Sequence, residues 1–183
     1  MPNYVRAYLP GGSFLFTVVT HQRRRLFSNE AAVDVIRDVV QEVRKGLPFT
    51  VDAWVLLPNH IHAVWTLPEG DTNFSKRWGL IKATFAKRVV AVGMVTTGES
   101  LWQPRFWEHR IRDERDFAAH IEYVYINPVK HGLAASVVDW PWSSFHRDVK
   151  RGLFPANWGS GIDVDESRQY GEPTDQQSGH CPP

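Results

Sequence analysis

The chain has 183 residues, of which 43% are hydrophobic and 22% charged, and its formal net charge is +1. This composition is typical of one globular domain with a filled core; it excludes a largely disordered chain, and the length leaves little room for a second domain. The only cysteine is Cys181, which excludes an internal disulfide, and no apolar run suits a signal peptide or a membrane helix, so we expect a cytoplasmic protein.

The first part of the chain predicts a strand followed by a helix. Residues 14–20 are rich in aromatic and β-branched side chains, which is typical of a buried strand. After a basic turn, Ser28 is the expected N-cap of a helix, and Gly46 and Pro48 end it. The apolar residues between these ends recur at helical spacing: Ala32, Val35, Ile36, Val39, Val40 and Val43.

Two histidines open a predicted β-hairpin. Residues 50–57 and 60–66 predict antiparallel strands joined by a tight turn at Pro58 and Asn59. Residues two apart on a strand point to the same face, so the imidazoles of His60 and His62 project together at a spacing that one divalent metal ion can bridge. Since such a pair is more often structural, the spacing alone leaves metal binding as a hypothesis.

The second half of the chain predicts two more helices and a strand. We expect a helix over residues 73–92, an extended segment over residues 102–111 broken at Pro104, and a helix over residues 113–127 that Pro128 ends. The order β-α-β-β-α-β-α matches an α+β fold, the ferredoxin-like split β-α-β antiparallel sheet, with an added C-terminal helix. In that topology the strand with the two histidines lies inside the sheet.

The remaining residues are expected to pack against the domain first and then to continue as a disordered tail. The run from Trp140 to Ser144 should pack back on the domain, whereas the Ser, Gly, Asp, Gln and Pro content after residue 158 predicts disorder. We therefore expect one domain over residues 1–158 and an acidic, disordered tail over residues 159–183.

The predicted third helix carries polar side chains suited to chemistry. One of its faces is apolar, with Phe117, Ile121 and Val124, and another holds Asp116, His120, Tyr123 and Asn127. Tyr123 and Asn127 are neighbours on the helix surface because they are four residues apart. If this face covers the histidine strand, a metal ion held by the imidazoles and the Asn127 oxygen can polarise a phosphate that the Tyr123 oxygen attacks.

A structural interpretation of the same helix stays open on spacing alone. Tyr123 and Tyr125 can be amphipathic residues at the rim of the core, and Asn127 can be a helix terminus before proline. A phenol also needs help to act as a nucleophile, since its reference pKa is near 10.

The charges are unevenly distributed along the chain. Residues 163–183 contain five acids and one base, which leaves 15 acids and 20 bases in residues 1–162. Basic residues clustered in this way are either solvated surface or a polyanion-binding face. The bases that would form such a face are Arg23, Arg24, Arg25, Lys82, Lys87, Arg88 and Arg105.

Three separated motifs resemble those of a known family. They are Leu-Pro-Asn-His-Ile-His at 57–62, Trp-Gln-Pro-Arg-Phe-Trp-Glu-His at 102–109 and Glu-Tyr-Val-Tyr-Ile-Asn-Pro-Val-Lys-His-Gly at 122–132. Together they look like the REP-associated tyrosine transposases, which are single-tyrosine HUH endonucleases of the IS200-like superfamily. The resemblance runs from Tyr4 to about Trp158.

The resemblance implies an activity and the residues that carry it. The family's two metal-binding histidines fall on His60 and His62, its nucleophile on Tyr123, and a third metal ligand on Asn127. Such enzymes cleave single-stranded DNA beside a hairpin through a 5′-phosphotyrosine intermediate, with magnesium or manganese. The resemblance therefore implies that the clustered bases named above contact DNA phosphates. Tyr125 competes for the nucleophile's role, but it points about 200° around the helix from Tyr123. The repeat-associated branch further implies a monomer, although a dimer is possible.

Two other functions remain to be distinguished from this one. A structured-DNA binding protein could keep the same scaffold without turnover; it would bind hairpins and cleave none. A zinc hydrolase could use the two strand histidines and a third ligand around an open position for water. The chain offers no obvious third His or Cys next to the motif, which disfavours the zinc hydrolase.

Overall fold

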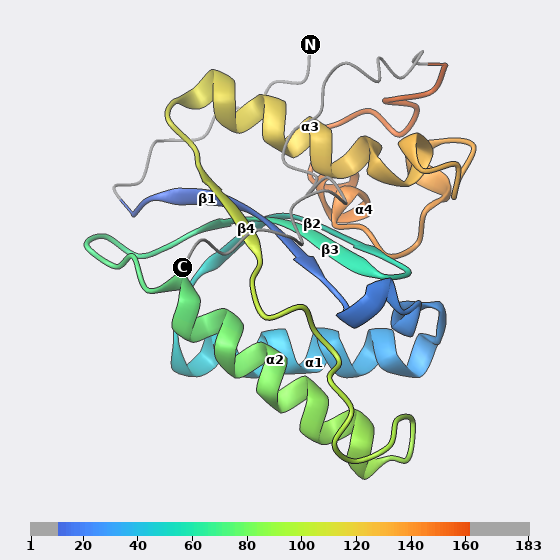
Figure 1. Cartoon of the computed structure of the whole chain (residues 1–183). Helices are drawn as coiled ribbons and strands as arrows, with labels where there is room; N and C mark the ends of the chain where they lie inside the picture. The colour runs from blue at the N-terminus through green and yellow to red at the C-terminus, as the bar shows by residue number, and fades with distance from the viewer. Residues whose placement is uncertain (1–10, 162–183) are drawn as a thin grey trace, which may run out of the picture.

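The computed structural model describes residues 11–161, which form a four-stranded sheet with helices on both faces (Figure 1). Within this range no helix is long and apolar enough to cross a membrane. The main elements are β1 (Ser13–Val19), α1 (Glu30–Gly46), β2 (Thr50–Leu57), β3 (His60–Thr66), α2 (Phe74–Ala91), β4 (Trp107–Arg110), α3 (Glu114–Lys130) and α4 (Phe145–Lys150). Three short 3-10 turns lie between them: η1 (His21–Arg23), η2 (Leu26–Ser28) and η3 (Val137–Asp139).

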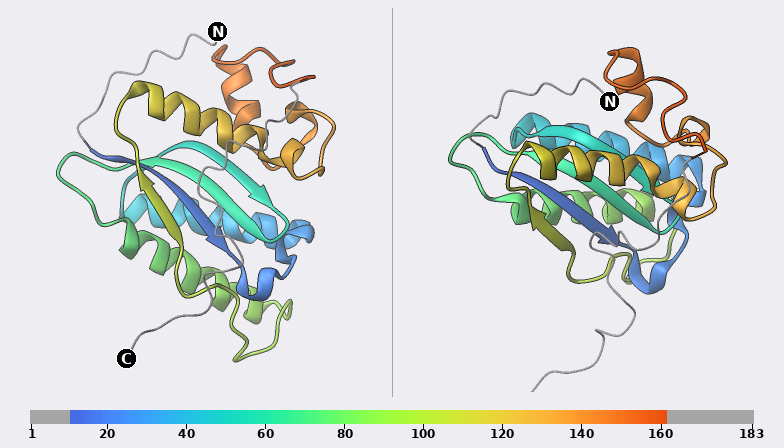
Figure 2. Two further views of the ribbon diagram at one scale, coloured as in Figure 1. Left: turned by 45° about the horizontal axis from the view of Figure 1, so that its top comes forward. Right: turned by 90° about the horizontal axis from the view of Figure 1, so that it is seen from above.

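The sheet is antiparallel, with its strands in the order β2-β3-β1-β4. This confirms the predicted α+β class and split β-α-β topology, and it puts the histidine strand β3 between two neighbours. Helices α1 and α2 cover one face, and α3 runs across the other, as the turned views show (Figure 2).

Alternation along β1 divides the core between the two faces of the sheet. Phe14, Phe16 and Val18 pack toward α1 and α2, whereas Leu15 packs with residues of α3. Since successive strand residues point to opposite faces, Thr17 lies on the α3 face as well. Its register partner on β3 is His62, so the sheet places a hydroxyl beside the second histidine.

The predicted hairpin and most element bounds are confirmed, but the N-cap of α1, the extent of the 102–111 strand and the end of the third helix differ from the prediction. Helix α1 is capped by Asn29, whose side chain accepts a hydrogen bond from the Ala31 N–H, and not by the predicted Ser28. Ser28 lies in η2, because the chain makes one more turn before the helix begins. The predicted extended segment 102–111 forms a regular strand only over its last part, β4.

The predicted end of the third helix is wrong. Helix α3 continues through Pro128 to Lys130, and His131 follows as its C-cap. Proline has no N–H to donate to the carbonyl one turn back, so the helix loses one backbone hydrogen bond at Pro128. Asn127 and Pro128 are both buried, and packing of this turn against the core offsets that loss. The extra turn places Lys130 and His131 next to the candidate site described below.

The segment after α3 covers the edge of β2, as predicted for residues 140–144. The indole N–H of Trp140 donates to the Leu56 carbonyl, and the Leu56 main-chain N–H donates to the Trp142 carbonyl. Ser144 continues this pairing at Trp54, through both its main-chain N–H and its hydroxyl. The predicted tail over residues 159–183 lies outside the described residues from 162 onward, so it stays a prediction.

Candidate active site

The two predicted metal-binding histidines begin strand β3 and are buried beneath α3. His60 is 6% exposed and His62 is fully buried. Their ring centroids lie 4.8 Å apart, with the ring planes nearly perpendicular at 88°. The alternation of the strand therefore does bring the two imidazoles together on one face.

A hydrogen bond to Nδ1 orients each imidazole. The Nδ1–H of His60 donates to the Asn59 side-chain oxygen at 2.7 Å, and Nδ1 of His62 is hydrogen-bonded to the Thr17 hydroxyl at 2.9 Å. Such contacts fix the ring and leave Nε2 as the coordinating nitrogen. Nε2 of His62 is buried and has no hydrogen-bond partner among the described residues.

Helix α3 places Tyr123 and Asn127 above these rings, as predicted. The centroids of the Tyr123 and His62 rings are 5.3 Å apart, and the Tyr123 side chain is 5% exposed. The Asn127 amide donates from Nδ2 to the Tyr123 carbonyl at 2.8 Å, which orients its oxygen. That oxygen is buried and accepts no hydrogen bond within the described part of the chain.

These residues fit a divalent metal ion. A buried nitrogen lone pair and a buried amide oxygen without partners cost about 1–3 kcal/mol each, unless a ligand satisfies them. His62 and Asn127 present one such atom each, and the oriented ring of His60 adds a third donor. Two imidazoles and one amide oxygen form a plausible partial coordination shell for a divalent cation.

The electrostatics of the site keep His62 in the form that binds metal. Burial lowers the pKa of His62 well below its ordinary value, and the charges of His60, His131 and Lys130 lower it further. The nearby Asn127 side chain opposes this shift. A neutral imidazole is the form that coordinates a metal, so His62 need not lose a proton on binding at neutral pH.

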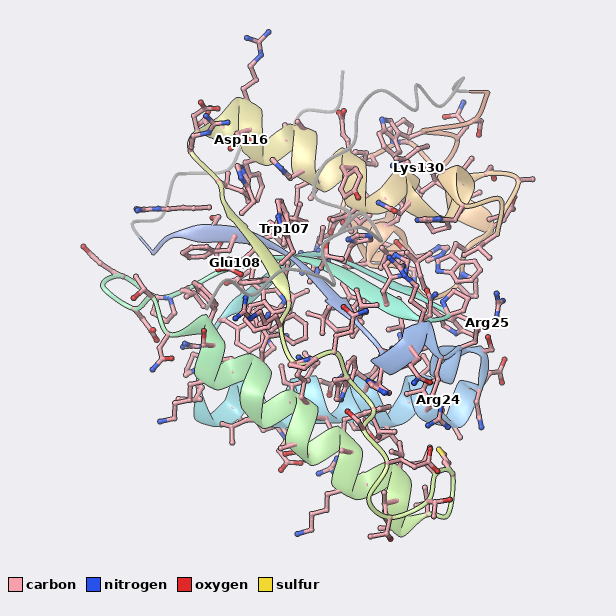
Figure 3. The ribbon with its side chains drawn as sticks, in the orientation of Figure 1. Arg24, Arg25, Trp107, Glu108, Asp116 and Lys130 are labelled. Atoms are coloured by element: carbon pink, nitrogen blue, oxygen red, sulfur yellow. The ribbon has the colours of Figure 1, made fainter. Side chains whose placement is uncertain are left out.

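Two residues of this cluster were missed by sequence reasoning. The His131 ring lies 5.4 Å from that of His60, and the Lys130 ammonium lies 5.6 Å from the centroid of the Tyr123 ring. Both follow Pro128, where the predicted helix stopped. Figure 3 shows Lys130 near the C-terminal end of α3. Contrary to the sequence-based expectation, a third histidine does lie beside the His-x-His pair.

Tyr125 points away from the site, as its helical angle predicts. Its hydroxyl donates to the Asp148 carboxylate at 2.6 Å and lies 3.1 Å from the Ser144 hydroxyl. Burial raises the pKa of Tyr125, and the charge of Asp148 raises it further. Tyr125 is therefore held as a neutral hydroxyl in the core, which makes it unsuited to act as a nucleophile.

The predicted DNA-contacting bases lie on several elements. Arg23, Arg24 and Arg25 are in the segment after β1, and Figure 3 shows Arg24 and Arg25 at one side of the molecule. Lys82, Lys87 and Arg88 are on α2, and Arg105 is exposed in the segment that leads to β4.

Arg24, Arg88 and Lys82 have contacts within the protein. Arg24 forms an ion pair with Glu99, and Arg88 forms one with Glu42. Lys82 donates to the Gln103 carbonyl at 2.8 Å, and burial lowers its pKa. Their contacts to DNA stay a prediction.

The chain is similar to proteins of one family. It matches the family model for IS200-like transposases over residues 13–124. It is 46% identical over 163 residues to the REP-associated tyrosine transposase of Escherichia coli (strain K12), a match that spans 88% of this chain and 93% of that protein. It is 39% identical over 171 residues to a putative REP-associated tyrosine transposase of Haemophilus influenzae (strain ATCC 51907 / DSM 11121 / KW20 / Rd), spanning 90% and 97%.

A solved structure agrees with these sequence matches. The structure of a REP-associated tyrosine transposase bound to a REP hairpin is similar to this chain with a TM-score of 0.75 and 43% sequence identity. The match covers 95% of this chain and all of the other.

Proposed function

This chain belongs to the REP-associated tyrosine transposases of the IS200-like family, and from that premise we propose that it cuts and rejoins single-stranded DNA beside hairpin-forming repeats. The proposed reaction is metal-dependent and passes through a 5′-phosphotyrosine intermediate. The observation that carries the proposal is that the His62 ring of β3 and the Tyr123 ring and Asn127 amide of α3 lie together in a buried position within one chain.

The proposed metal ligands are His60, His62 and Asn127, with magnesium or manganese as the ion. When bound, the ion polarises the scissile phosphate and stabilises the charge that develops there. The protein holds the ligands still: Asn59 and Thr17 fix the imidazoles, and the carbonyl of Tyr123 fixes the Asn127 amide.

In the proposed cleavage step, the Tyr123 oxygen attacks the phosphorus in line with the leaving 3′ oxygen. The Tyr123 O–P bond forms as the P–O3′ bond breaks, the phenolic proton passes to water, and the 3′ oxygen takes up a proton. The 5′-phosphate stays on the tyrosine. Attack by a 3′ hydroxyl then reverses the same bonds and joins the strands.

Lys130 is suited to assist this step through its charge. Its ammonium lies 5.6 Å from the centroid of the Tyr123 ring, where it attracts the negative charge of a phosphate and of the developing phenolate. The proposed DNA partner carries one such charge for each phosphate, so the cation also favours binding.

The decisive experiment incubates the protein with a 5′-labelled hairpin oligonucleotide that carries single-stranded flanks, in the presence of Mn²⁺ or Mg²⁺. We expect a shortened 5′-labelled product, and a protein band shifted by covalent attachment of the unlabelled 3′ fragment, which keeps the 5′ phosphate. The Tyr123→Phe variant should form neither product. The matched control is Tyr125→Phe, which removes a hydroxyl from the same helix and should still cleave, because Tyr125 faces Asp148.

The same assay separates the alternatives. Tight hairpin binding with no cleavage under either metal would favour a non-catalytic DNA-binding protein. Zinc-dependent hydrolysis without an adduct would favour a hydrolase. The proximity of His131 to His60 supports that alternative, because it offers a third histidine near the pair. Cleavage by Tyr123→Phe at the wild-type rate would contradict the assigned nucleophile.

A further inference from the structure

A second cluster of metal-binding side chains lies at the other end of α3. It consists of His109 on β4 and of Asp116 and His120 on α3. Each residue offers one ligand atom, and these atoms lie within 4.8 Å of one another. No other group of three His, Cys, Asp or Glu side chains comes together in this way among residues 11–161. We propose that this cluster is a second metal site, specific for a zinc-type transition-metal ion.

The contacts around Asp116 have the spacing of zinc ligands. One Asp116 carboxylate oxygen lies 3.1 Å from Nε2 of His109, which is a ligand-like spacing; the other lies 3.1 Å from Nδ1 of His120, whose Nε2 is the ligand atom. Zinc binds imidazole nitrogen and carboxylate oxygen at about 2.0–2.2 Å, so two ligands at a tetrahedral angle are roughly 3.3 Å apart. The ligand atoms of the cluster lie up to 4.8 Å apart, so shifts of about 1.5 Å complete a tetrahedral site.

The surrounding hydrogen bonds hold the three side chains in a ligand-like arrangement. The Asp116 carboxylate accepts the Arg112 main-chain N–H at 3.0 Å. Nδ1–H of His120 donates to the Asp116 main-chain carbonyl at 2.7 Å, the kind of outer contact that directs Nε2 of a histidine to a metal. The His109 ring stacks on the Trp107 ring with an interplanar angle of 7°.

Burial favours a metal over a simple ion pair. The side chain of His120 is 2% exposed and that of Asp116 is 15% exposed. The cluster thus combines two imidazoles and one carboxylate, a ligand set that suits zinc with a water in the fourth position.

The cluster is separate from the candidate active site. His109 pairs with Leu15 on β1, whereas His62 pairs with Thr17 and lies across β1 on the other side. Figure 3 shows Asp116 near the start of α3 and Lys130 near its end. A metal ion at the second site would join the short edge strand β4 to the N-terminal half of the helix that carries Tyr123. The inference does not rest on the proposed function.

The test begins with a variant that lacks the predicted catalytic histidines, His60→Ala/His62→Ala. Dialysis against Zn²⁺ followed by metal analysis should find one equivalent in this variant, and Co²⁺ should give the visible bands of a tetrahedral site. Adding His109→Ala and His120→Ala should abolish both signals. At a zinc concentration one hundred times Kd, bound metal should raise the unfolding midpoint by roughly 5–10 °C.

Two further variants keep the test informative if the histidine changes harm folding. Asp116→Asn, made in the His60→Ala/His62→Ala background, preserves the shape of the side chain and should weaken zinc binding at least tenfold. His21→Ala in the same background removes a histidine outside both clusters and should leave zinc binding unchanged. The inference is overturned if the starting variant binds no zinc, or if Asp116→Asn binds zinc as tightly as its parent.

Discussion

At the scale of single residues, the candidate site depends on groups that never touch the substrate. Thr17 is buried in the sheet, and its hydroxyl holds Nδ1 of His62, which leaves Nε2 of that ring for the proposed metal ion. Asn59 does the same for His60 from the turn that precedes β3. Sequence patterns propose the ligands, but they do not show that Thr17 supports His62, because that contact depends on the register between β1 and β3.

The Thr17 hydroxyl can be tested directly. Thr17→Val keeps the side-chain shape but leaves Nδ1 of His62 without its partner, so the ring loses its fixed orientation. We expect metal affinity at the active site to fall about 10–100-fold. Thr17→Ser retains the hydroxyl and is the matched control. Titration with Mn²⁺, followed by calorimetry, measures both variants, and equal affinities would contradict the role assigned to this contact.

Lys130 provides a second test at this scale. Lys130→Gln removes the cation that lies over the Tyr123 ring. We expect the single-turnover cleavage rate to fall about tenfold to a hundredfold, at or below the lower end of the roughly 100- to 1,000-fold loss seen when one charge-stabilising donor is removed. Lys130→Arg keeps the charge and should retain most of the rate. An unchanged rate in Lys130→Gln would leave Lys130 as a packing residue.

At the scale of elements, helix ends explain where sequence reasoning went wrong. Ser28 is a residue type that caps helices well, but in the folded chain the side chain of Asn29 accepts the hydrogen bond from the Ala31 N–H at the start of α1. The proline rule failed at Pro128 because burial of the last turn of α3 outweighs one missing hydrogen bond. Both errors concern terminal turns, where tertiary contacts compete with small local preferences.

The capping assignment yields a paired prediction. Asn29→Ala should lower the free energy of unfolding by about 1 kcal/mol, since it removes the acceptor for the Ala31 N–H. Ser28→Ala, one residue away, should change it by less than half as much. Urea unfolding of the two variants measures the difference, and the opposite order would restore Ser28 as the cap.

The ion pair between Asp71, which precedes α2, and Arg77 within α2 predicts how stability depends on pH. The hydrogen bond from Arg77, followed by that from the Asn73 main-chain N–H, holds the pKa of Asp71 below its ordinary value. A lowered pKa means that this contribution is fully present above the unfolded-state pKa and is lost as the pH falls through the folded-state pKa. Asp71→Asn should therefore destabilise by up to about 1 kcal/mol at pH 7. Urea unfolding at neutral and acidic pH should show the difference from wild type shrinking in acid; a constant difference would contradict it.

At the scale of the whole molecule, the alternation and order of the elements were enough to predict the sheet and the position of β3 within it. The motif at 57–62 and the spacing of Tyr123 from Asn127 predicted that these side chains lie together, as they do, whereas their catalytic and metal-binding roles stay a prediction. The cluster of His109, Asp116 and His120 could not be predicted as a unit, because β4 and α3 meet only in the folded chain. Long-range contact, rather than local pattern, supplies that information.

The proximity of the His62 and Tyr123 rings, 5.3 Å apart within one chain, has a genetic consequence. A site built from two subunits can be rebuilt by mixing two dead variants, each of which supplies the half that the other lacks. Here His62→Ala and Tyr123→Phe each damage a self-contained unit, so an equimolar mixture should cleave no better than either variant alone. Recovery near a quarter of wild-type activity would mean that the catalytic halves are exchanged between chains. Without such recovery, the two variants fail to complement each other, as expected when both changes affect one site within one chain.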